Sequence, residues 1–384
     1  MAWEFASAGR VLFGPGVSAE VPRLAAGLGR RALLVHGRRA APAEPLAAGL
    51  AAEGLAVERL AVPGEPEVAW VDQAAERARA AGVELVVSLG GGSVLDAGKA
   101  IAGLVANGGQ ALDYLEGLGR GQALGRPALP QVAVPTTAGT GSEVTRNAVL
   151  GSPSHRRKAS LRSHHLLPRL AVVDPALGLS LPPEITAASG LDALTQLLEA
   201  FVCARANPLV DALCREGLAR SARSLRRACQ APGDLAARTD LSLAALLSGL
   251  ALANAGLGAV HGLAGVLGGL LGAPHGALCA ALLPHALRVN TRALRARDPQ
   301  APALAKLREA AGLLTGQAGA GPEDLADWAE RLTTDLEVPR LRRLGLAPEA
   351  HAEVAAQAAT ASSMKANPVA LDLAELVEIL RAAG

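Results

Sequence analysis

Lysine is scarce in this sequence, and neither sign of charge is in large excess. The formal net charge is +2 over 384 residues, and no segment interleaves aromatic with basic side chains. These absences argue against nucleic acid or an anionic membrane surface as a partner. Because only four lysines occur, a lysine beside a motif is a candidate for a specific role of its ammonium group. The four are Lys99, Lys158, Lys306 and Lys365.

Cysteine is equally rare and forms no C-x-x-C pair. All four cysteines lie in the second half of the chain, at Cys203, Cys214, Cys229 and Cys279. We interpret them as buried thiols of a protein in a reducing compartment. The N-terminus lacks a basic segment followed by an apolar core, so we expect no signal peptide and a cytoplasmic location.

Charged residues are missing from the whole stretch between Leu241 and Leu287. An apolar run of this length is also typical of a membrane span. However, Asn254, His261, Pro274 and His275 interrupt it, and no aromatic belt or basic flank brackets it. We therefore predict helices buried in a large helical core, and no membrane partner.

The first half of the chain alternates apolar strands with helices. Continuous apolar strands separated by helices are typical of a parallel sheet that is covered on both faces. Beyond residue 183 nearly everything has helical period, with breaks expected at prolines 208, 232, 274, 284 and 322. The sequence thus predicts an α/β domain over 1–180 and an all-α domain over 181–384. The predicted strands are 31–36, 55–62, 84–89, 131–135 and 170–174, and the helices between them are 42–53 and 68–81.

Two glycine-containing loops follow predicted strands. Gly90-Gly-Gly-Ser93 ends the strand at 84–89 and precedes a helix that carries Asp96 and Lys99, so backbone N–H groups and the helix N-terminus can hold an anion. The spacing is not G-x-G-x-x-G, and a purely structural turn is the alternative. The loop of residues 135–143 follows the next strand, and its hydroxyls, including that of Ser142, are candidates to line a nucleotide cleft.

The second half contains a set of metal-ligand residue types. Asp192 and Gln196 are four residues apart and share one face of a helix. With His261 and His275 they match the N/O ligation of catalytic Fe or Zn. A carboxamide oxygen donates weakly, so Gln196 is expected to be either a weak fourth ligand or a neighbour just outside the donor set. The alternative is that both histidines are ordinary core residues.

In this order, these segments resemble the iron-containing (group III) alcohol dehydrogenase family over essentially the whole chain. The resemblance rests on the segments 90–99, 135–143, 174–175, 190–194 and 261–276. It implies a dinucleotide-binding α/β domain, a helical domain that binds metal and substrate, and an active site in the cleft between them. The implied reaction is hydride transfer between NAD or NADP and an alcohol or aldehyde, with Fe²⁺ or Zn²⁺ as Lewis acid.

The resemblance also assigns residues to roles. Asp192, His261 and His275 would be catalytic through the metal. The cofactor contacts that it implies are Gly91, Gly92, Ser93, Asp96, Thr136, Thr137 and Lys158. A homodimer is expected, and the segments 3–5 and 10–13 are candidate strands for pairing across the two copies.

Two positions depart from the family pattern. Position 196 carries Gln where the family has His, and Gly265 stands where the family often has a further histidine. A proton that such a histidine relays would here have to pass through water or another group. Three alternatives stay open: a metal-independent reductase of an oxo-acid, resembling maleylacetate reductases; a lyase resembling dehydroquinate synthase; and a nucleotide-binding protein without catalysis.

The choice between NAD and NADP depends on the end of the strand at 31–36. In several relatives that prefer NAD, an acidic residue follows this strand and accepts bonds from the ribose 2′-hydroxyl. Here the run is His36-Gly37-Arg38-Arg39, with no acid to repel a 2′-phosphate and two guanidinium groups nearby. Gly37 is therefore a candidate cofactor contact, and NADP fits at least as well as NAD. The alternative is that both arginines simply face water.

Overall fold

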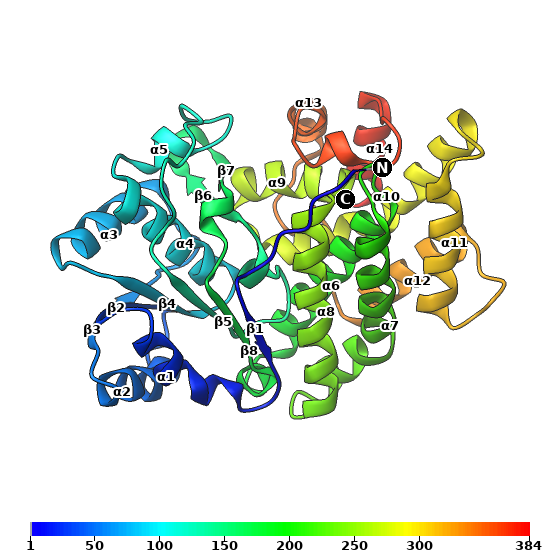
Figure 1. Ribbon diagram of the computed structural model, residues 1–384. Helices are drawn as coiled ribbons and strands as arrows, with labels where there is room; N and C mark the ends of the chain where they lie inside the picture. Colours follow the sequence, from blue (N-terminus) through cyan, green and yellow to red (C-terminus); the bar gives the residue numbers. More distant parts are fainter. Residues whose placement is uncertain (1) are drawn as a thin grey trace. The chain divides into compact units, whose positions relative to one another are not determined.

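The structure is a computed structural model that describes residues 2–384, and it divides into two compact units. The α/β unit contains residues 6–137 and 141–179. The helical unit contains residues 180–384, together with the segments 2–5 and 138–140. In Figure 1 the α/β unit runs from blue to green and the helical unit from green to red.

A six-stranded sheet forms the centre of the α/β unit, and every pair of neighbouring strands in it is parallel. The strand order is β1-β8-β5-β4-β2-β3. All five predicted strands are present. The strands are β1 (Val11–Phe13), β2 (Arg31–His36), β3 (Ala56–Ala61), β4 (Leu85–Gly90), β5 (Gln131–Pro135) and β8 (Leu170–Val173).

Two features of the sheet structure need comment. β1 is the edge strand of the sheet, where it pairs with β8 of its own chain, and residues 3–5 form no strand within the single chain, so the pairing of these segments across a dimer stays a prediction. An antiparallel hairpin of β6 (Asn147–Ser152) and β7 (Arg157–Arg162) was not predicted. Its β7 strand is mostly exposed or half-buried, so it lacks the apolar run by which buried strands are identified in a sequence.

Helices cover both faces of the sheet, as the apolar strands require. Alternate residues of β2 point to opposite faces. Leu33 and Val35 pack with α3 (Val68–Ala80) and α4 (Gly92–Asn107) on one face. Ala32 and Leu34 pack with α1 (Val21–Ala26) and α2 (Glu44–Ala52) on the other face. The short helix α5 (Ala111–Tyr114) lies beside α3.

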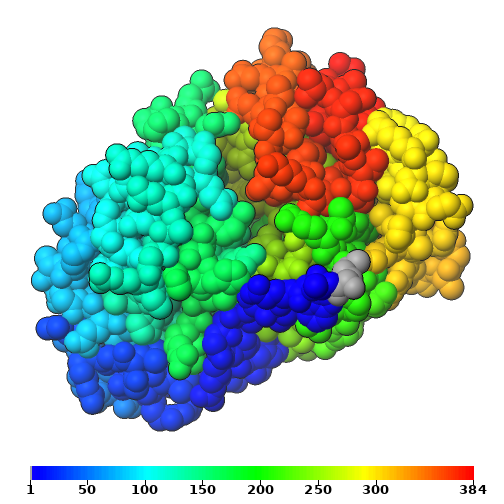
Figure 2. Space-filling model, turned by 45° about the horizontal axis from the view of Figure 1, so that its top comes forward, coloured from blue at the N-terminus to red at the C-terminus, as the bar shows by residue number. Residues whose placement is uncertain are grey.

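The helical unit is built around one large apolar core. α6, α7, α11 and α12 each begin with a proline, the residue whose missing N–H costs nothing at that position. The helices are α6 (Pro183–Val202), α7 (Pro208–Gln230), α8 (Leu235–Asn254), α9 (Ala259–Leu271), α10 (His275–Arg297), α11 (Pro302–Thr315), α12 (Pro322–Asp335), α13 (His351–Ala359) and α14 (Leu373–Ala382). α13 and α14 pack on each other at the surface, in orange and red in Figure 2.

The predicted break at Pro284 is wrong, because α10 continues through this residue. A proline inside a helix costs about 3 kcal/mol. Pro284 is buried, and α10 packs against α6 and α12. Tertiary packing of this kind outweighs the local cost.

The uncharged stretch folds as α8, α9 and the first half of α10. The predicted break at Pro274 lies between α9 and α10, whereas the break between α8 and α9 was not predicted. α8 is long and apolar enough to cross a membrane by length and composition, and 56% of its most apolar window is buried inside the protein. It packs against α6 and α7, as a core helix of the unit does.

Candidate functional site

The structure brings three of the predicted metal ligands together within the helical unit. Asp192 lies in the middle of α6, His261 in the first turn of α9, and His275 at the first position of α10. The Nε2 atom of His261 is 3.3 Å from Oδ1 of Asp192, and Nε2 of His275 is 3.8 Å from the same oxygen. Asp192 and His261 are buried, whereas the side chain of His275 is 35% exposed, so the cluster opens on the His275 side.

Cys279 joins this cluster, and the sequence did not predict it. Its Sγ atom is 3.6 Å from Nε2 of His275. One donor atom from each of Asp192, His261, His275 and Cys279 lies within 4.8 Å of all the others. The signal in the sequence was the spacing, because a residue four positions after His275 shares its helical face. All four cysteines are buried and unpaired, as expected.

Gln196 lies one turn after Asp192 on α6 and is buried. Its Oε1 atom accepts a hydrogen bond of 2.9 Å from the hydroxyl of Ser248 on α8. The amide oxygen therefore already has a protein partner. Of the two roles predicted for Gln196, this contact favours a neighbour outside the donor set.

Glu199 is a second residue that the sequence did not single out. One oxygen of its carboxylate lies 2.6 Å from Nδ1 of His261, and the other accepts a hydrogen bond of 2.7 Å from the N–H of Val260. Glu199 therefore caps α9 and makes Nδ1 of His261 the donor, which leaves Nε2 free to bind a metal. Its signal was the spacing of Asp192, Gln196 and Glu199, which marks one helical face.

The charges of the cluster attract a cation. Burial disfavours a charged imidazole, but the neighbouring Cys279 and Asp192 outweigh burial and raise the pKa of His261 well above its ordinary value. Burial also disfavours the Asp192 carboxylate, yet the hydrogen bond from His261 keeps the pKa of Asp192 lowered. Without an ion, a proton satisfies this excess of negative charge, and a divalent ion can replace that proton.

The spacing of the donor atoms fits such an ion. Ligands about 2.1 Å from a tetrahedral ion stand about 3.4 Å apart, and a sulfur at about 2.3 Å stands about 3.6 Å from a nitrogen ligand. The Asp192–His261 and Asp192–His275 distances are 3.3 and 3.8 Å, and the sulfur of Cys279 lies 3.6 Å from the His275 nitrogen. A divalent ion would need only small movements of these side chains.

The two predicted nucleotide loops leave neighbouring strands of the α/β unit. Gly90 at the end of β4 is in register with Pro135 at the end of β5, and β2 lies on the other side of β4. The residues that follow these three strands, including Gly37, Gly91 and Thr136, thus start from one edge of the sheet. The connections reverse direction between β4 and β2, and crevices at such points commonly bind nucleotides.

The phosphate loop keeps its backbone accessible. α4 begins at Gly92, with no side-chain cap on its N-terminus from residues 2–384. The first N–H groups of the helix can therefore serve an anion. A Cβ atom added at Gly91 would lie 3.3 Å from the hydroxyl oxygen of Thr137, so the glycine keeps the space between the two loops open.

Asp96 and Lys99 hold the second loop against α4. The Asp96 carboxylate accepts bonds from the hydroxyl of Ser142 and from the N–H of Val149, and it pairs with Lys99 at 3.1 Å. The ammonium group of Lys99, fully buried, donates to the carbonyl of Ser142 at 2.9 Å and to the hydroxyl of Thr145 at 3.0 Å. The role shown for these side chains is to fix the loop that carries Ser142.

The remaining predicted cofactor residues lie nearby in the α/β unit. Lys158 is on β7, where it forms an ion pair of 2.5 Å with Glu65. Gly37 directly follows β2, and nothing in residues 2–384 comes within 4 Å of its Cβ position. Arg38 bonds the carbonyl of Pro63. Gly37 thus leaves open space where a ribose is predicted.

Replacing Gly91 by valine is expected to abolish dinucleotide binding without unfolding the protein. The branched side chain would fill the space beside Thr137 through which backbone N–H groups approach a pyrophosphate. Isothermal calorimetry with NADH and NADPH measures the loss, and circular dichroism checks the fold. Unchanged cofactor affinity in the folded variant would reject the assignment of this loop.

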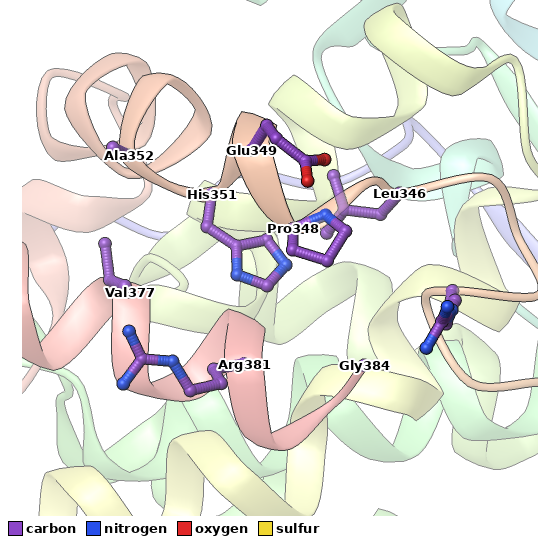
Figure 3. A pocket seen from close by; sticks show the side chains of 9 residues that line it. Leu346, Pro348, Glu349, His351, Ala352, Val377, Arg381 and Gly384 are labelled. Atoms are coloured by element: carbon purple, nitrogen blue, oxygen red, sulfur yellow. The ribbon is translucent and has the colours of Figure 1, made fainter.

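A separate pocket of about 400 Å³ lies in the helical unit, between α14 and the segment that leads into α13. Its lining includes Arg342, His351 and Arg381, and Figure 3 shows the His351 and Arg381 side chains in it. None of the predicted site residues lines it. This pocket is therefore not the site of the metal cluster.

Comparison with known families covers both units. Residues 8–175 match the model described as iron-containing alcohol dehydrogenase. Residues 186–384 match the model of the C-terminal part of the Fe-containing alcohol dehydrogenase family. Together the two models span nearly the whole chain.

Individual relatives agree with these matches. Alcohol dehydrogenase 4 of Saccharomyces cerevisiae is 38% identical over 301 residues, which is 78% of this chain and 76% of the relative. The crystal structure of a 1,3-propanediol oxidoreductase matches all of both chains, with a TM-score of 0.90 and 33% identity. The sulfoacetaldehyde reductase of Bifidobacterium kashiwanohense in complex with NAD⁺ matches with a TM-score of 0.86 and 28% identity, over 99% of this chain and 98% of the other.

Proposed function

The chain belongs to the iron-containing alcohol dehydrogenase family and is an oxidoreductase of alcohols or aldehydes, and we propose that it transfers a hydride between NAD(H) and a small alcohol or its aldehyde. We further propose that Asp192, His261 and His275 hold one divalent ion for this reaction. The relatives that support the substrate class are an alcohol dehydrogenase and a 1,3-propanediol oxidoreductase, and the relative that supports the cofactor is in complex with NAD⁺.

One observation carries the metal-dependent form of this proposal. Asp192 and His261 converge from two helices to 3.3 Å, and Glu199 holds the other nitrogen of His261 at 2.6 Å. A carboxylate behind a histidine is the arrangement that orients metal ligands and fixes their tautomer.

Several residues would have separate roles in this reaction. A divalent ion held at this cluster supplies a Lewis acid for the oxygen of the substrate. Glu199 orients His261, and the exposed side of His275 leaves room for a small molecule to approach. Gly265 is exposed, and nothing in residues 2–384 lies within 4 Å of its Cβ position. Water can therefore reach this point and carry the proton that a side chain at 265 would otherwise carry.

Elemental analysis combined with cofactor oxidation assays tests the proposal. The purified protein is analysed for iron and zinc, then assayed for NADH and NADPH oxidation over a panel of aldehydes before and after exhaustive chelation. We expect one ion per chain, loss of activity on chelation, and recovery when Fe²⁺ or Zn²⁺ is returned. Absence of hydride transfer to every aldehyde would reject the oxidoreductase function proposed here.

Replacing Gly37 by aspartate is expected to shift cofactor preference toward NADH. The new carboxylate would stand after β2, where the ribose is predicted, and would repel a 2′-phosphate while accepting bonds from a 2′-hydroxyl. The measurement is the ratio of kcat/KM for NADPH and NADH in the wild type and the variant. If this ratio stays the same, or changes in favour of NADPH, Gly37 does not lie at the ribose site.

A further inference from the structure

We infer that the thiolate of Cys279 is the fourth protein ligand of the metal, in the place that Gln196 would otherwise take; this inference rests on the proposed function. Cys279 lies on α10 one turn after His275, with its sulfur 3.6 Å from the His275 nitrogen. Its sulfur also lies within 4.8 Å of the donor atoms of Asp192 and His261. A sulfur and a nitrogen bound to one tetrahedral ion stand about 3.6 Å apart.

Gln196 is the weaker candidate because its amide is a neutral, weak donor. Its amide oxygen accepts a hydrogen bond of 2.9 Å from the hydroxyl of Ser248, and this bond joins α6 to α8. One lone pair of the oxygen is thus in use, and the other could offer an ion only the weak contact of a carboxamide. The thiol of Cys279, in contrast, lies among the other proposed ligands, with its sulfur 3.6 Å from the His275 nitrogen and close to Asp192 and His261.

The balance of charge also favours Cys279 as the fourth ligand. Asp192 is 2% exposed and Cys279 is completely buried. A divalent ion held by one carboxylate and neutral donors would leave a positive charge in this buried place, which is costly. When the thiol of Cys279 loses its proton to solvent as the ion binds, one carboxylate and one thiolate balance the two charges of the ion. The second carboxylate, Glu199, is already engaged with His261 and the N-terminus of α9.

A thiolate changes which ions the site prefers. Soft sulfur ligands favour zinc, whereas carboxylate, amide and water oxygens suit harder ions. The donor set Asp192, His261, His275 and Cys279 should therefore favour Zn²⁺ and Co²⁺ over Fe²⁺ more strongly than the same site without the sulfur.

The test compares three variants of the full chain with the wild type. Cys279→Ser removes the thiolate, Gln196→Leu removes the amide, and Cys229→Ser is the matched control at another buried cysteine that lies outside the cluster. Chelated protein is titrated anaerobically with Co²⁺, and the near-ultraviolet absorption of thiolate-to-cobalt charge transfer is recorded. Zn²⁺ affinity is measured by competition with a chromophoric chelator.

We expect the charge-transfer band in the wild type, Gln196→Leu and Cys229→Ser, and its loss in Cys279→Ser. Zn²⁺ affinity should fall about 100-fold or more in Cys279→Ser, since even residues behind the ligands contribute 10–100-fold. Gln196→Leu should change it by less than about threefold. X-ray absorption of the wild-type zinc protein, with one sulfur expected at about 2.3 Å, gives a reading that does not depend on any variant folding.

The outcomes separate this inference from the proposed function. A wild-type protein that takes up neither Co²⁺ nor Zn²⁺ would overturn this inference and the metal-dependent form of the proposed function, but not hydride transfer itself. Metal uptake without a charge-transfer band and without sulfur in the absorption spectrum would overturn the role of Cys279 alone, and would leave its thiol as a hydrogen-bond partner of His275. Loss of Zn²⁺ affinity in Gln196→Leu to the same extent as in Cys279→Ser would show that the amide is a ligand.

Discussion

Replacing His261 by alanine is expected to strip the protein of its metal and to lower kcat/KM by roughly 10³-fold. A Lewis acid contributes several kcal/mol to transition-state stabilisation, and about 4 kcal/mol corresponds to a factor of roughly 10³. His261 is the ligand whose loss should cost most, because it is buried and its ring is fixed by Glu199 at 2.6 Å. His275→Ala should also lower the metal content and kcat/KM.

The fold should survive this change. Glu199 would still accept the N–H of Val260 at the start of α9, so the helix keeps its cap when the imidazole is removed. His285→Ala is the matched control, since this histidine lies on α10 but outside the metal cluster. The measurements are metal content, kcat/KM with NADH and an aldehyde, and circular dichroism.

The opposite result would have a definite meaning. If His261→Ala, or wild-type protein after exhaustive chelation, keeps full turnover, the Lewis-acid mechanism is wrong. The metal-independent reductase of an oxo-acid would then be the better description of the activity. Substrates for the next assays would be chosen accordingly.

The fold was predictable because its strands are buried on both faces. Strands β2, β4 and β5 are almost wholly buried, and such continuous apolar runs are distinctive in a sequence. β7 is not of this kind, since it pairs in a small hairpin with polar residues on its exposed side. The break predicted at Pro284 is wrong for a related reason. The helix α10 continues through this proline because of its packing against α6 and α12, which lie far away in the sequence.

The metal cluster was predictable as a set of residue types and only in part as a set of positions. Asp192, His261 and His275 carry side chains that have few uses other than charge and ligation. Cys279 and Glu199 each lie on the same helical face as a predicted ligand, yet the sequence does not say which face of α10 or α6 meets its neighbour. The contact between Gln196 and Ser248 likewise depends on how α6 and α8 pack.

Replacing Gly276 by alanine is expected to open the metal site by separating two helices. A Cβ atom at this position would lie 2.1 Å from the carbonyl oxygen of Ala188, far inside van der Waals contact, and the obstacle is backbone that cannot rotate away. Gly276 directly follows His275, and Ala188 lies one turn before Asp192 on α6. The helices that carry these two ligands must therefore move apart by more than an ångström.

Both the Zn²⁺ affinity and the free energy of unfolding should fall. Zn²⁺ affinity should fall about 100-fold, because ligands displaced by this amount no longer share one ion. The free energy of unfolding should fall by about 1–3 kcal/mol, the usual cost of overpacking a tight core.

Gly312→Ala is the matched control. Gly312 lies in the interior of α11, where the nearest atom to an added Cβ is 3.6 Å away. That change should leave metal affinity intact, since an alanine is favoured over glycine inside a helix. Chelator competition and chemical denaturation measure the two quantities. Wild-type metal affinity in Gly276→Ala would mean that α6 and α10 can part without disturbing the ligands, and the close approach at Gly276 would then serve packing alone.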